Sequence, residues 1–245
     1  AFADTAVTLW KNRERRFELL GPAPAAGATG HGLEIALTGD FNLGGEFWGE
    51  IMAAEFNFDR EGGRTDYWRF ARAMYAAGFR KGELVYNTFS YHFTPAGFMA
   101  DLGAQAIGCA VFPAGVGQTE MQVAAIAALR PQCYVGTPSF LKIILKKGDD
   151  LNADVSSIRK ALVSAEALPP SLRASLGERG IKTLQCYAIG DLGLLAYESP
   201  ALEGMIVDEG VIVEIVRPGT GEPVAEGEVG EVLVTSLAPE YPLIR

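Results

Sequence analysis

The sequence predicts an α/β fold in which a parallel sheet flanked by helices is followed by an antiparallel β module. Between residues 65 and 200, five short apolar runs alternate with segments of helical periodicity. This alternation is typical of right-handed crossovers in a parallel sheet that helices cover on both faces. After Asp191, β-branched runs replace the helical segments, and residues 218–221 and 226–228 separate them as turns. Short glycine-bearing turns of this kind connect antiparallel strands.

The first 64 residues show no clear pattern of secondary structure. Residues 2–20 could form a helix, residues 21–32 have a linker-like composition, and residues 33–37 could form a short strand. Gly44 and Gly45 lack the Lys and the Ser or Thr of a phosphate-binding P-loop. We therefore divide the chain into an N-terminal segment (1–64), a parallel α/β region (65–200) and a β-rich module (201–245).

The parallel region is expected to open with an amphipathic helix. Thr65 or Asp66 can cap its amino end, apolar residues between Trp68 and Ala77 suit one buried side, and Gly78 can end it. Five strands should follow, at residues 83–87, 109–113, 133–136, 160–164 and 181–187. Helices are expected between them, at residues 94–106, 120–129, 138–147 and 169–179. The β-rich module should add strands at residues 205–208, 211–216 and 231–237.

Composition excludes several classes of protein. The chain has 245 residues, 49% of them hydrophobic, which predicts a sizeable core and not a disordered chain. A net charge of −9 without a basic stripe argues against a nucleic-acid partner. No apolar run reaches the roughly 18 residues of a membrane span, and no secretory segment opens the chain. Cys109, Cys133 and Cys186 lie in apolar contexts without metal spacing, which favours buried thiols of a cytoplasmic protein over disulfides.

Polar or glycine-bearing segments follow each of the five expected parallel strands. They cover residues 90–93, 114–117, 136–139, 164–166 and 187–191. In open parallel sheets the ligand binds at the carboxyl ends of the strands, so these segments should form one site.

The segment from Tyr187 to Asp191 is the centre of this expected site. Its aromatic ring offers a stacking face, Ala188 and Gly190 allow close approach to the backbone, and the carboxylate can hold a metal or a hydroxyl group. On this segment alone, a tight turn with a solvated Asp is the favoured interpretation, and the neighbouring segments shift the balance toward a site.

From about residue 67 to residue 245 the chain resembles the phenylacetate–coenzyme A ligase branch of the AMP-forming, adenylate-forming enzymes. The resemblance rests on residues 87–97, 112–120, 137–139, 164–166, 187–191 and 241–245. It implies the large N-terminal domain of that family. It also implies a two-step reaction in which ATP activates a small carboxylic acid to an acyl-adenylate and coenzyme A then displaces AMP.

The resemblance assigns nucleotide-binding roles to two segments. Ser164, Ala165 and Glu166 match the segment that lines the adenine pocket. Tyr187 matches the aromatic residue that stacks on adenine, and Ala188 and Gly190 follow it in the same segment, where Gly190 replaces a hydroxyl residue. Asp191 stands where the family more often has Glu, as a catalytic ligand of Mg²⁺. Such a carboxylate–Mg²⁺ pair suits the task of stabilising an anionic phosphorus centre.

The acyl substrate is expected between two other loops. His92, with Tyr91 and Phe93, matches the position that gates the acyl pocket, and we take His92 as a second catalytic candidate. Gly136, Thr137 and Pro138 should complete a mostly apolar pocket for an aryl or short-chain acid. Alternatively, His92 is simply a polar residue at a helix start.

Other features depart from the family. Its phosphate loop ending in Lys is not visible before Thr65, and its ribose-binding Asp and small C-terminal domain would follow Arg245. Truncation, omitted loops and lost activity all stay open, and we expect little turnover from these 245 residues alone.

Besides an acyl-CoA ligase, a homologue that binds nucleotide or acyl ligand without catalysis remains an alternative. A nicotinamide-dependent oxidoreductase lacks its Gly-x-Gly-x-x-Gly signature, and a purely structural domain leaves five converging loops unexplained. The sequence also leaves a homodimer open.

Overall fold

The computed structural model describes residue 66 and residues 68–236. The elements expected before residue 65 and the motif at residues 241–245 lie outside the described residues. Within them, a seven-stranded sheet has the order β2-β1-β3-β4-β5-β6-β7, and β8 and β9 form a separate two-stranded sheet. This arrangement confirms the expected mostly parallel sheet followed by an antiparallel module.

The first five strands are parallel, as predicted. They are β1 (Leu84–Asn87), β2 (Ala110–Pro113), β3 (Cys133–Gly136), β4 (Lys160–Val163) and β5 (Lys182–Ile189). Strand β1 pairs in parallel with both β2 and β3, and β4 pairs with β3 and β5. Because all five run in the same direction, their carboxyl ends meet at one edge of the sheet.

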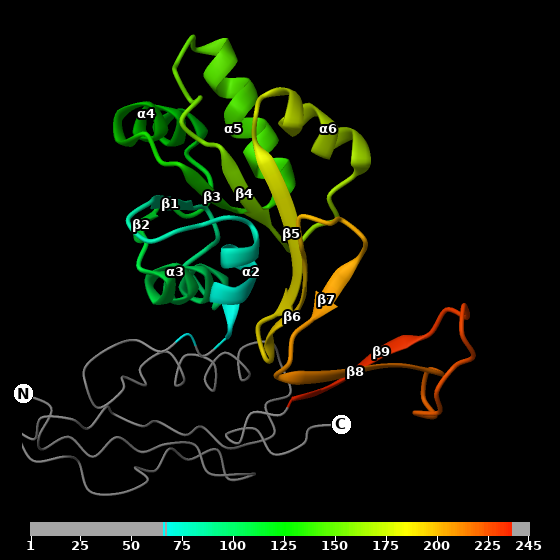
Figure 1. The fold of residues 1–245 in the computed structure, drawn as a ribbon. Helices are drawn as coiled ribbons and strands as arrows, with labels where there is room; N and C mark the ends of the chain where they lie inside the picture. Colours follow the sequence, from blue (N-terminus) through cyan, green and yellow to red (C-terminus); the bar gives the residue numbers. More distant parts are fainter. Residues whose placement is uncertain (1–65, 67, 237–245) are drawn as a thin grey trace, which may run out of the picture.

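Helices cover both faces of this sheet (Figure 1). Helices α2 (Phe70–Ala76) and α3 (Ala96–Ile107) share one hydrophobic core with the sheet. Helices α4 (Thr119–Leu129), α5 (Pro138–Asp150) and α6 (Pro170–Glu178) share the other. Within β1, Val85 belongs to the first core and Tyr86 to the second, so successive side chains of a strand are buried on opposite faces.

Helix boundaries follow from local capping. Both carboxylate oxygens of Asp66 accept hydrogen bonds at the start of α2, from the backbone nitrogens of Phe70 at 3.0 Å and Ala71 at 2.7 Å. Thr137 caps α5 through its hydroxyl, which accepts from the Phe140 nitrogen at 3.3 Å, and Pro138 takes the first helical position.

Strand β5 continues two residues beyond the expected end at Tyr187. Ala188 and Ile189 pair in antiparallel fashion with Leu194 and Gly193 of β6 (Gly193–Glu198), after a bulge between Tyr187 and Ala188. The turn therefore lies at residues 190–192, where Gly190 and Asp191 were expected. Strand β7 (Met205–Val207) pairs with β6 and completes the large sheet.

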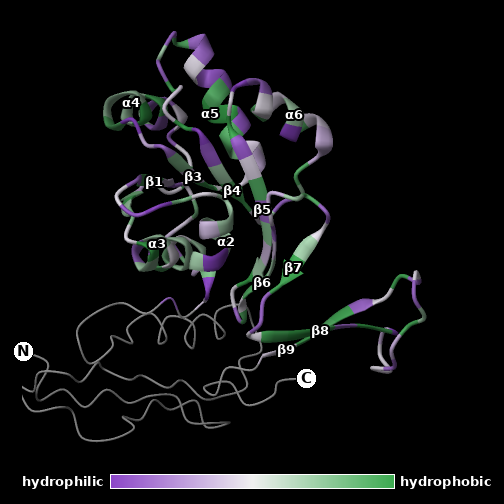
Figure 2. Ribbon diagram, in the orientation of Figure 1, coloured by the Kyte–Doolittle hydropathy of each residue, from purple (hydrophilic) through white to green (hydrophobic). Residues whose placement is uncertain are grey.

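Strands β8 (Val211–Val216) and β9 (Glu231–Ser236) form the antiparallel hairpin that the β-branched runs predict. The hairpin projects away from the large sheet (Figure 1), and much of it is hydrophobic (Figure 2). The three cysteines are buried free thiols, as expected. Within residue 66 and residues 68–236, no helix is both long enough and apolar enough to cross a membrane.

Candidate functional site

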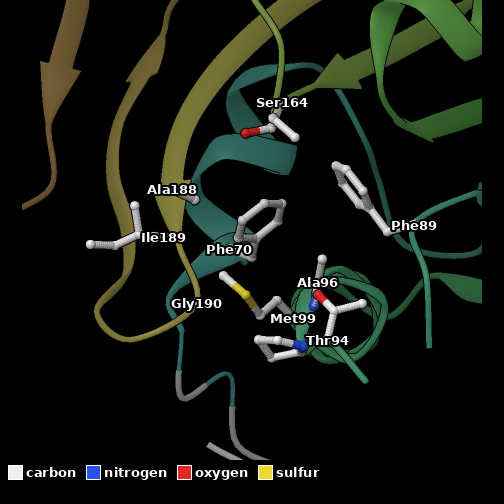
Figure 3. Close-up of a pocket in the computed structure, with 11 residues that line it drawn as sticks. Phe70, Phe89, Thr94, Ala96, Met99, Ser164, Ala188, Ile189 and Gly190 are labelled. Atoms are coloured by element: carbon white, nitrogen blue, oxygen red, sulfur yellow. Dashed lines mark hydrogen bonds between the residues drawn. The ribbon is translucent and has the colours of Figure 1, made fainter. Parts of the chain in front are cut away.

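A small apolar cavity opens at the carboxyl edge of the sheet, next to the β5–β6 turn (Figure 3). Its volume is about 110 Å³. Side chains from α2, from the β1–α3 loop with the start of α3, and from the ends of β4 and β5 surround it. The lining residues are Phe70, Phe89, Thr94, Pro95, Ala96, Met99, Ser164, Ala165, Ala188, Ile189 and Gly190. Most of these side chains are hydrocarbon, so the cavity suits an apolar group.

Ser164 and Ala165 contribute to the cavity from the end of β4. The Ser164 hydroxyl donates to the Cys186 carbonyl at 2.9 Å and so ties the end of β4 to β5. Ala165 adopts a positive φ of 67°, a conformation that a non-glycine residue rarely takes. The chain turns sharply at this point and leaves the next side chain, Glu166, on the surface.

Glu166 meets the amino end of α5 instead of the cavity. Its carboxylate accepts from the Ser139 hydroxyl at 2.9 Å and from the Ser139 backbone nitrogen at 3.3 Å. Pro138, Ser139 and Glu166 border a second, open groove of about 390 Å³, together with Lys142, Ile143, Lys146, Ala167, Pro169 and Leu172.

Gly136 is required for the close packing of neighbouring loops. A Cβ at this position would lie 2.0 Å from the Thr88 hydroxyl oxygen, because that hydroxyl donates to the Tyr134 hydroxyl at 2.8 Å beside it. Thr137 serves as the cap of α5 described above. Neither Gly136 nor Thr137 lines the apolar cavity.

Tyr91 is an anchor of the β1–α3 loop. Buried Asn87 donates to the Tyr91 hydroxyl at 2.7 Å and to the Gly97 carbonyl at 2.8 Å. The Tyr91 ring packs edge-on against Phe98, with centroids 5.2 Å apart. Burial, together with the nearby charge of Asp101, raises the pKa of the Tyr91 hydroxyl, although the Asn87 hydrogen bond opposes the shift. Tyr91 therefore stays neutral and holds the loop.

His92 and Phe93 lie on the outside of this loop. Both side chains are exposed, Phe93 to 81%, and their rings are 4.2 Å apart between centroids. Neither residue lines the cavity, whereas Thr94, Pro95 and Ala96, the three residues that follow, do.

The β5–β6 hairpin contributes the remaining candidates. Ala188, Ile189 and Gly190 line the cavity, and Asp191 follows them in the turn. Tyr187 does not line the cavity and is 46% exposed. The structure thus brings Ser164, Ala165, Ala188 and Gly190 together around one cavity and places Tyr187 and Asp191 on the same hairpin.

Phe70 and Met99 are cavity residues that sequence reasoning missed. Both lie on helices, α2 and α3, at positions where helical periodicity predicts ordinary core residues. Only the fold shows that the packing between these two helices and β5 leaves a gap. The spacing of the apolar residues carries no signal for it.

Mg²⁺ is a hard cation that needs several oxygen ligands. Among the described residues, no group of three or more His, Cys, Asp and Glu side chains could hold a metal ion. A Mg²⁺ ion at Asp191 would therefore need further oxygen ligands, such as phosphate oxygens of a substrate.

The chain is similar in sequence to several known proteins. The family model for AMP-binding enzymes matches residues 108–238. The phenylacetate-coenzyme A ligase of Pseudomonas putida is 32% identical over 186 residues, which cover 71% of this chain and 42% of that protein. The ligase of the same name from Aromatoleum evansii is 30% identical over 183 residues, with the same two coverages. The chain thus spans about 42% of the length of these curated relatives.

Solved structures are similar in fold. An open conformation of 2-hydroxyisobutyryl-CoA ligase, in complex with 2-HIB-AMP and CoA, superposes with a TM-score of 0.64 at 20% identity. The match covers 72% of this chain and 45% of that one. An anthranilate CoA ligase in complex with anthranoyl-AMP gives a TM-score of 0.58 at 21% identity, over 73% of this chain and 36% of that one.

Proposed function

The chain belongs to the family of AMP-binding enzymes, and on this premise we propose that the complete protein is an acyl-CoA ligase for a small, largely apolar carboxylic acid. The observation that supports this most directly is the apolar cavity beside the hairpin that carries Tyr187 and Asp191. The curated relatives are phenylacetate-coenzyme A ligases, which agrees with an aryl group in such a cavity.

The proposed reaction has two steps. A carboxylate oxygen of the acid attacks the α-phosphorus of ATP, the bond to the β-phosphate oxygen breaks, and pyrophosphate leaves. The sulfur of coenzyme A then attacks the acyl carbon of the adenylate, the acyl–oxygen bond breaks, AMP leaves, and the thiol proton is released. ATP and coenzyme A are thus both consumed as substrates.

Different residues of the chain have different roles in this reaction. The exposed ring of Tyr187 stacks on adenine, and the backbone of the loop from Ser164 to Glu166 borders the base. Asp191 would hold Mg²⁺. When bound, this ion supplies positive charge that offsets the charge of the reacting phosphate. His92 and Phe93, which are exposed on the β1–α3 loop, border the entrance for the acid.

The acyl group occupies the cavity between α2, α3 and β5. For comparison, an apolar cavity of about 150 Å³ is large enough to bind benzene. The cavity of about 110 Å³ is smaller than this but opens at the sheet edge, so a short aliphatic chain or part of a phenyl ring can enter it while the carboxylate stays at the opening. A second charge on the acid would face Phe70, Phe89 and Met99 without a partner, and its burial would be costly.

ATP–pyrophosphate exchange tests this function directly. We expect the complete natural protein to exchange label in the presence of phenylacetate, benzoate or a short aliphatic acid, and to respond far less to succinate. If it binds ATP but no acid supports exchange, the protein is a homologue that binds without catalysis. A preference for succinate over phenylacetate would refute the assignment of the cavity to the acyl group.

Three further parts of the proposal concern the whole protein. We propose that residues 65–200 bind nucleotide and acyl group and that residues 201–245 contribute the β-rich module, although β7 of that module completes the large sheet. A cytoplasmic location and a homodimer also stay predictions, which fractionation and light scattering would test.

A further inference from the structure

Two adjacent residues ahead of α2, Trp68 and Arg69, hold the β5–β6 turn from the side. The Trp68 indole nitrogen donates to the Gly190 carbonyl at 3.1 Å, and the Leu194 nitrogen donates to the Trp68 carbonyl at 3.0 Å. The Arg69 guanidinium donates through Nη2 to the Leu192 carbonyl at 2.7 Å and to the Leu194 carbonyl at 3.2 Å. These bonds flank Asp191 on both sides along the chain.

Trp68 lies so close to the β5–β6 turn that it restricts which residue can occupy position 193. Gly193 has a φ of 74°, and a Cβ there would lie 2.7 Å from the Trp68 carbonyl oxygen and 2.8 Å from the Trp68 Cα. Both neighbours are backbone atoms, which cannot move aside as a flexible side chain could. Any other residue at position 193 would therefore push the turn away from Trp68.

Arg69 is itself fixed in place. It adopts a left-handed backbone conformation with φ 61°, which is unfavourable for a non-glycine residue. Its Nε donates to Asp208 Oδ1 at 2.7 Å, and the Asp208 side chain is 0% exposed. The backbone nitrogen of Asp208 donates to the Leu195 carbonyl at 2.8 Å, so the carboxylate is anchored to β6. A fixed guanidinium fork with two carbonyl acceptors and one carboxylate sets a geometry that a lysine could not reproduce.

We infer that Trp68 and Arg69 are positioning residues that set the place of Asp191 and of the Gly190 wall of the cavity. The role of Asp191 in this inference rests on the proposed function. The hydrogen bonds of Trp68 and Arg69 to the turn are independent of that function. Neither residue lines the cavity. They act through the turn, by fixing the carbonyls of the residues immediately before and after Asp191.

Variants can separate positioning from folding. Arg69→Gln removes the fork but leaves the Asp208 charge buried without its main partner, which would destabilise the protein. The double variant Arg69→Gln with Asp208→Asn removes that unpaired charge, so it should regain stability but not the hydrogen bonds to Leu192 and Leu194. Trp68→Phe keeps an aromatic ring but removes the bond to Gly190 together with part of the buried indole volume. Arg130→Gln is the matched control, because Arg130 also pairs with an aspartate, the exposed Asp154, and makes no bond to the β5–β6 hairpin or to Asp208.

Two measurements on the complete natural protein test the inference. Hydrogen–deuterium exchange should be faster at residues 188–196 in the double variant and in Trp68→Phe, and unchanged in Arg130→Gln. The Mg²⁺ concentration for half-maximal ATP–pyrophosphate exchange should rise about 10- to 100-fold in the double variant, the usual cost of losing a residue that orients a metal ligand. Thermal melting should show that the double variant is folded.

The outcomes keep the two proposals apart. If the wild type exchanges pyrophosphate and the folded double variant shows the same Mg²⁺ dependence, the positioning role is refuted and the proposed function stands. If the wild type supports no exchange with any acid, the proposed function fails, and amide exchange alone decides whether the two residues hold the turn. Unchanged amide exchange at residues 188–196 refutes the inference in either case.

Discussion

Ser139 donates to the Glu166 carboxylate twice, from its hydroxyl at 2.9 Å and from its backbone nitrogen at 3.3 Å. The contact joins the loops that follow β3 and β4, two of the five at the carboxyl edge. It also places a carboxylate at the amino end of α5, where the helix dipole favours negative charge. Glu166 therefore anchors the loop whose backbone we propose to border adenine.

Replacing Glu166 tests this anchor. We expect Glu166→Ala to lower the free energy of unfolding by at most about 1 kcal/mol, since the contact is exposed. ATP affinity should fall several-fold, because the loop from Ser164 to Glu166 loses its tie to α5. Calorimetric titration with ATP and urea denaturation measure the two effects. Glu178→Ala, at the end of α6, is the control, and an equal loss of ATP affinity in both variants would contradict the prediction.

Tyr187 is expected to carry the stacking interaction with the base. Tyr187→Ala should weaken adenine nucleotide binding by roughly 1–3 kcal/mol, the value of a lost aromatic stacking face. Tyr187→Phe keeps the ring and should bind ATP almost as well as the wild type. Calorimetry of ATP and of pyrophosphate separates base from phosphate contacts. Equal ATP affinity in the alanine variant and the wild type would exclude stacking on this ring.

The cavity predicts how substrate preference can be changed. Ala96 lines it from the start of α3, so Ala96→Leu fills part of the space meant for an aryl ring. We expect kcat/KM for phenylacetate to fall by about 10- to 200-fold, the range for a change of pocket size, with much less effect on acetate. Ala106→Leu, exposed near the other end of the same helix, is the control. Equal losses for both acids would place the acyl group elsewhere.

Much of the fold could be predicted because strands β1, β3 and β4 are buried on both faces. Continuous apolar runs such as residues 133–136 reveal such strands without any knowledge of their partners. The order of the strands in the sheet could not be predicted. Strand β1 lies between β2 and β3, and no local sequence pattern encodes the position in the sheet to which a crossover connection leads. Likewise, β5 extends to Ile189 because Ala188 finds a partner in Leu194, a pairing that lies outside the expected strand.

The site could be predicted as a set of loops but not as a geometry. Parallel strands bring their carboxyl ends together, so Ser164, Ala165, Ala188 and Gly190 were expected near one another. The hydrogen bond from Arg69 to Leu192 spans 123 positions in the sequence, and no periodicity could reveal it. Residue types at 91–93 could not show that Tyr91 turns inward to Asn87 while Phe93 faces solvent.

Asp66 should make the stability of the protein depend on pH. Burial raises the pKa of its carboxyl, although the hydrogen bonds from Ala71 and Phe70 oppose the shift. A raised folded-state pKa means that the folded protein holds this proton more tightly than the unfolded chain. The contribution of Asp66 to stability is therefore fully present below the ordinary pKa and is lost as pH rises through the folded-state value.

Two substitutions separate this charge from the cap. Asp66→Asn keeps an acceptor and cannot ionise. Its free energy of unfolding should therefore increase relative to that of the wild type as pH rises from about 3.5 to 7. Asp66→Ala loses the cap and should cost about 0.5–2 kcal/mol. Urea denaturation across this pH range provides both comparisons. A difference between Asn variant and wild type that does not change with pH would contradict the raised pKa.

Asp191 distinguishes an enzyme from a homologue that only binds nucleotide. In a working site its carboxylate would hold Mg²⁺ next to the phosphates of ATP. Asp191→Asn keeps the shape and removes the charge, so adenylation should fall at least about a hundredfold, as when a preorganised charge-stabilising group is lost. ATP binding without Mg²⁺ should change far less. Asp191→Glu, which restores a carboxylate, should retain much of the activity, whereas Asp150→Asn on the surface of α5 should change nothing. These rates come from ATP–pyrophosphate exchange on the complete natural protein. If the asparagine variant adenylates as fast as the wild type, another group must hold the cation, and the hairpin of β5 and β6 contributes only its stacking ring.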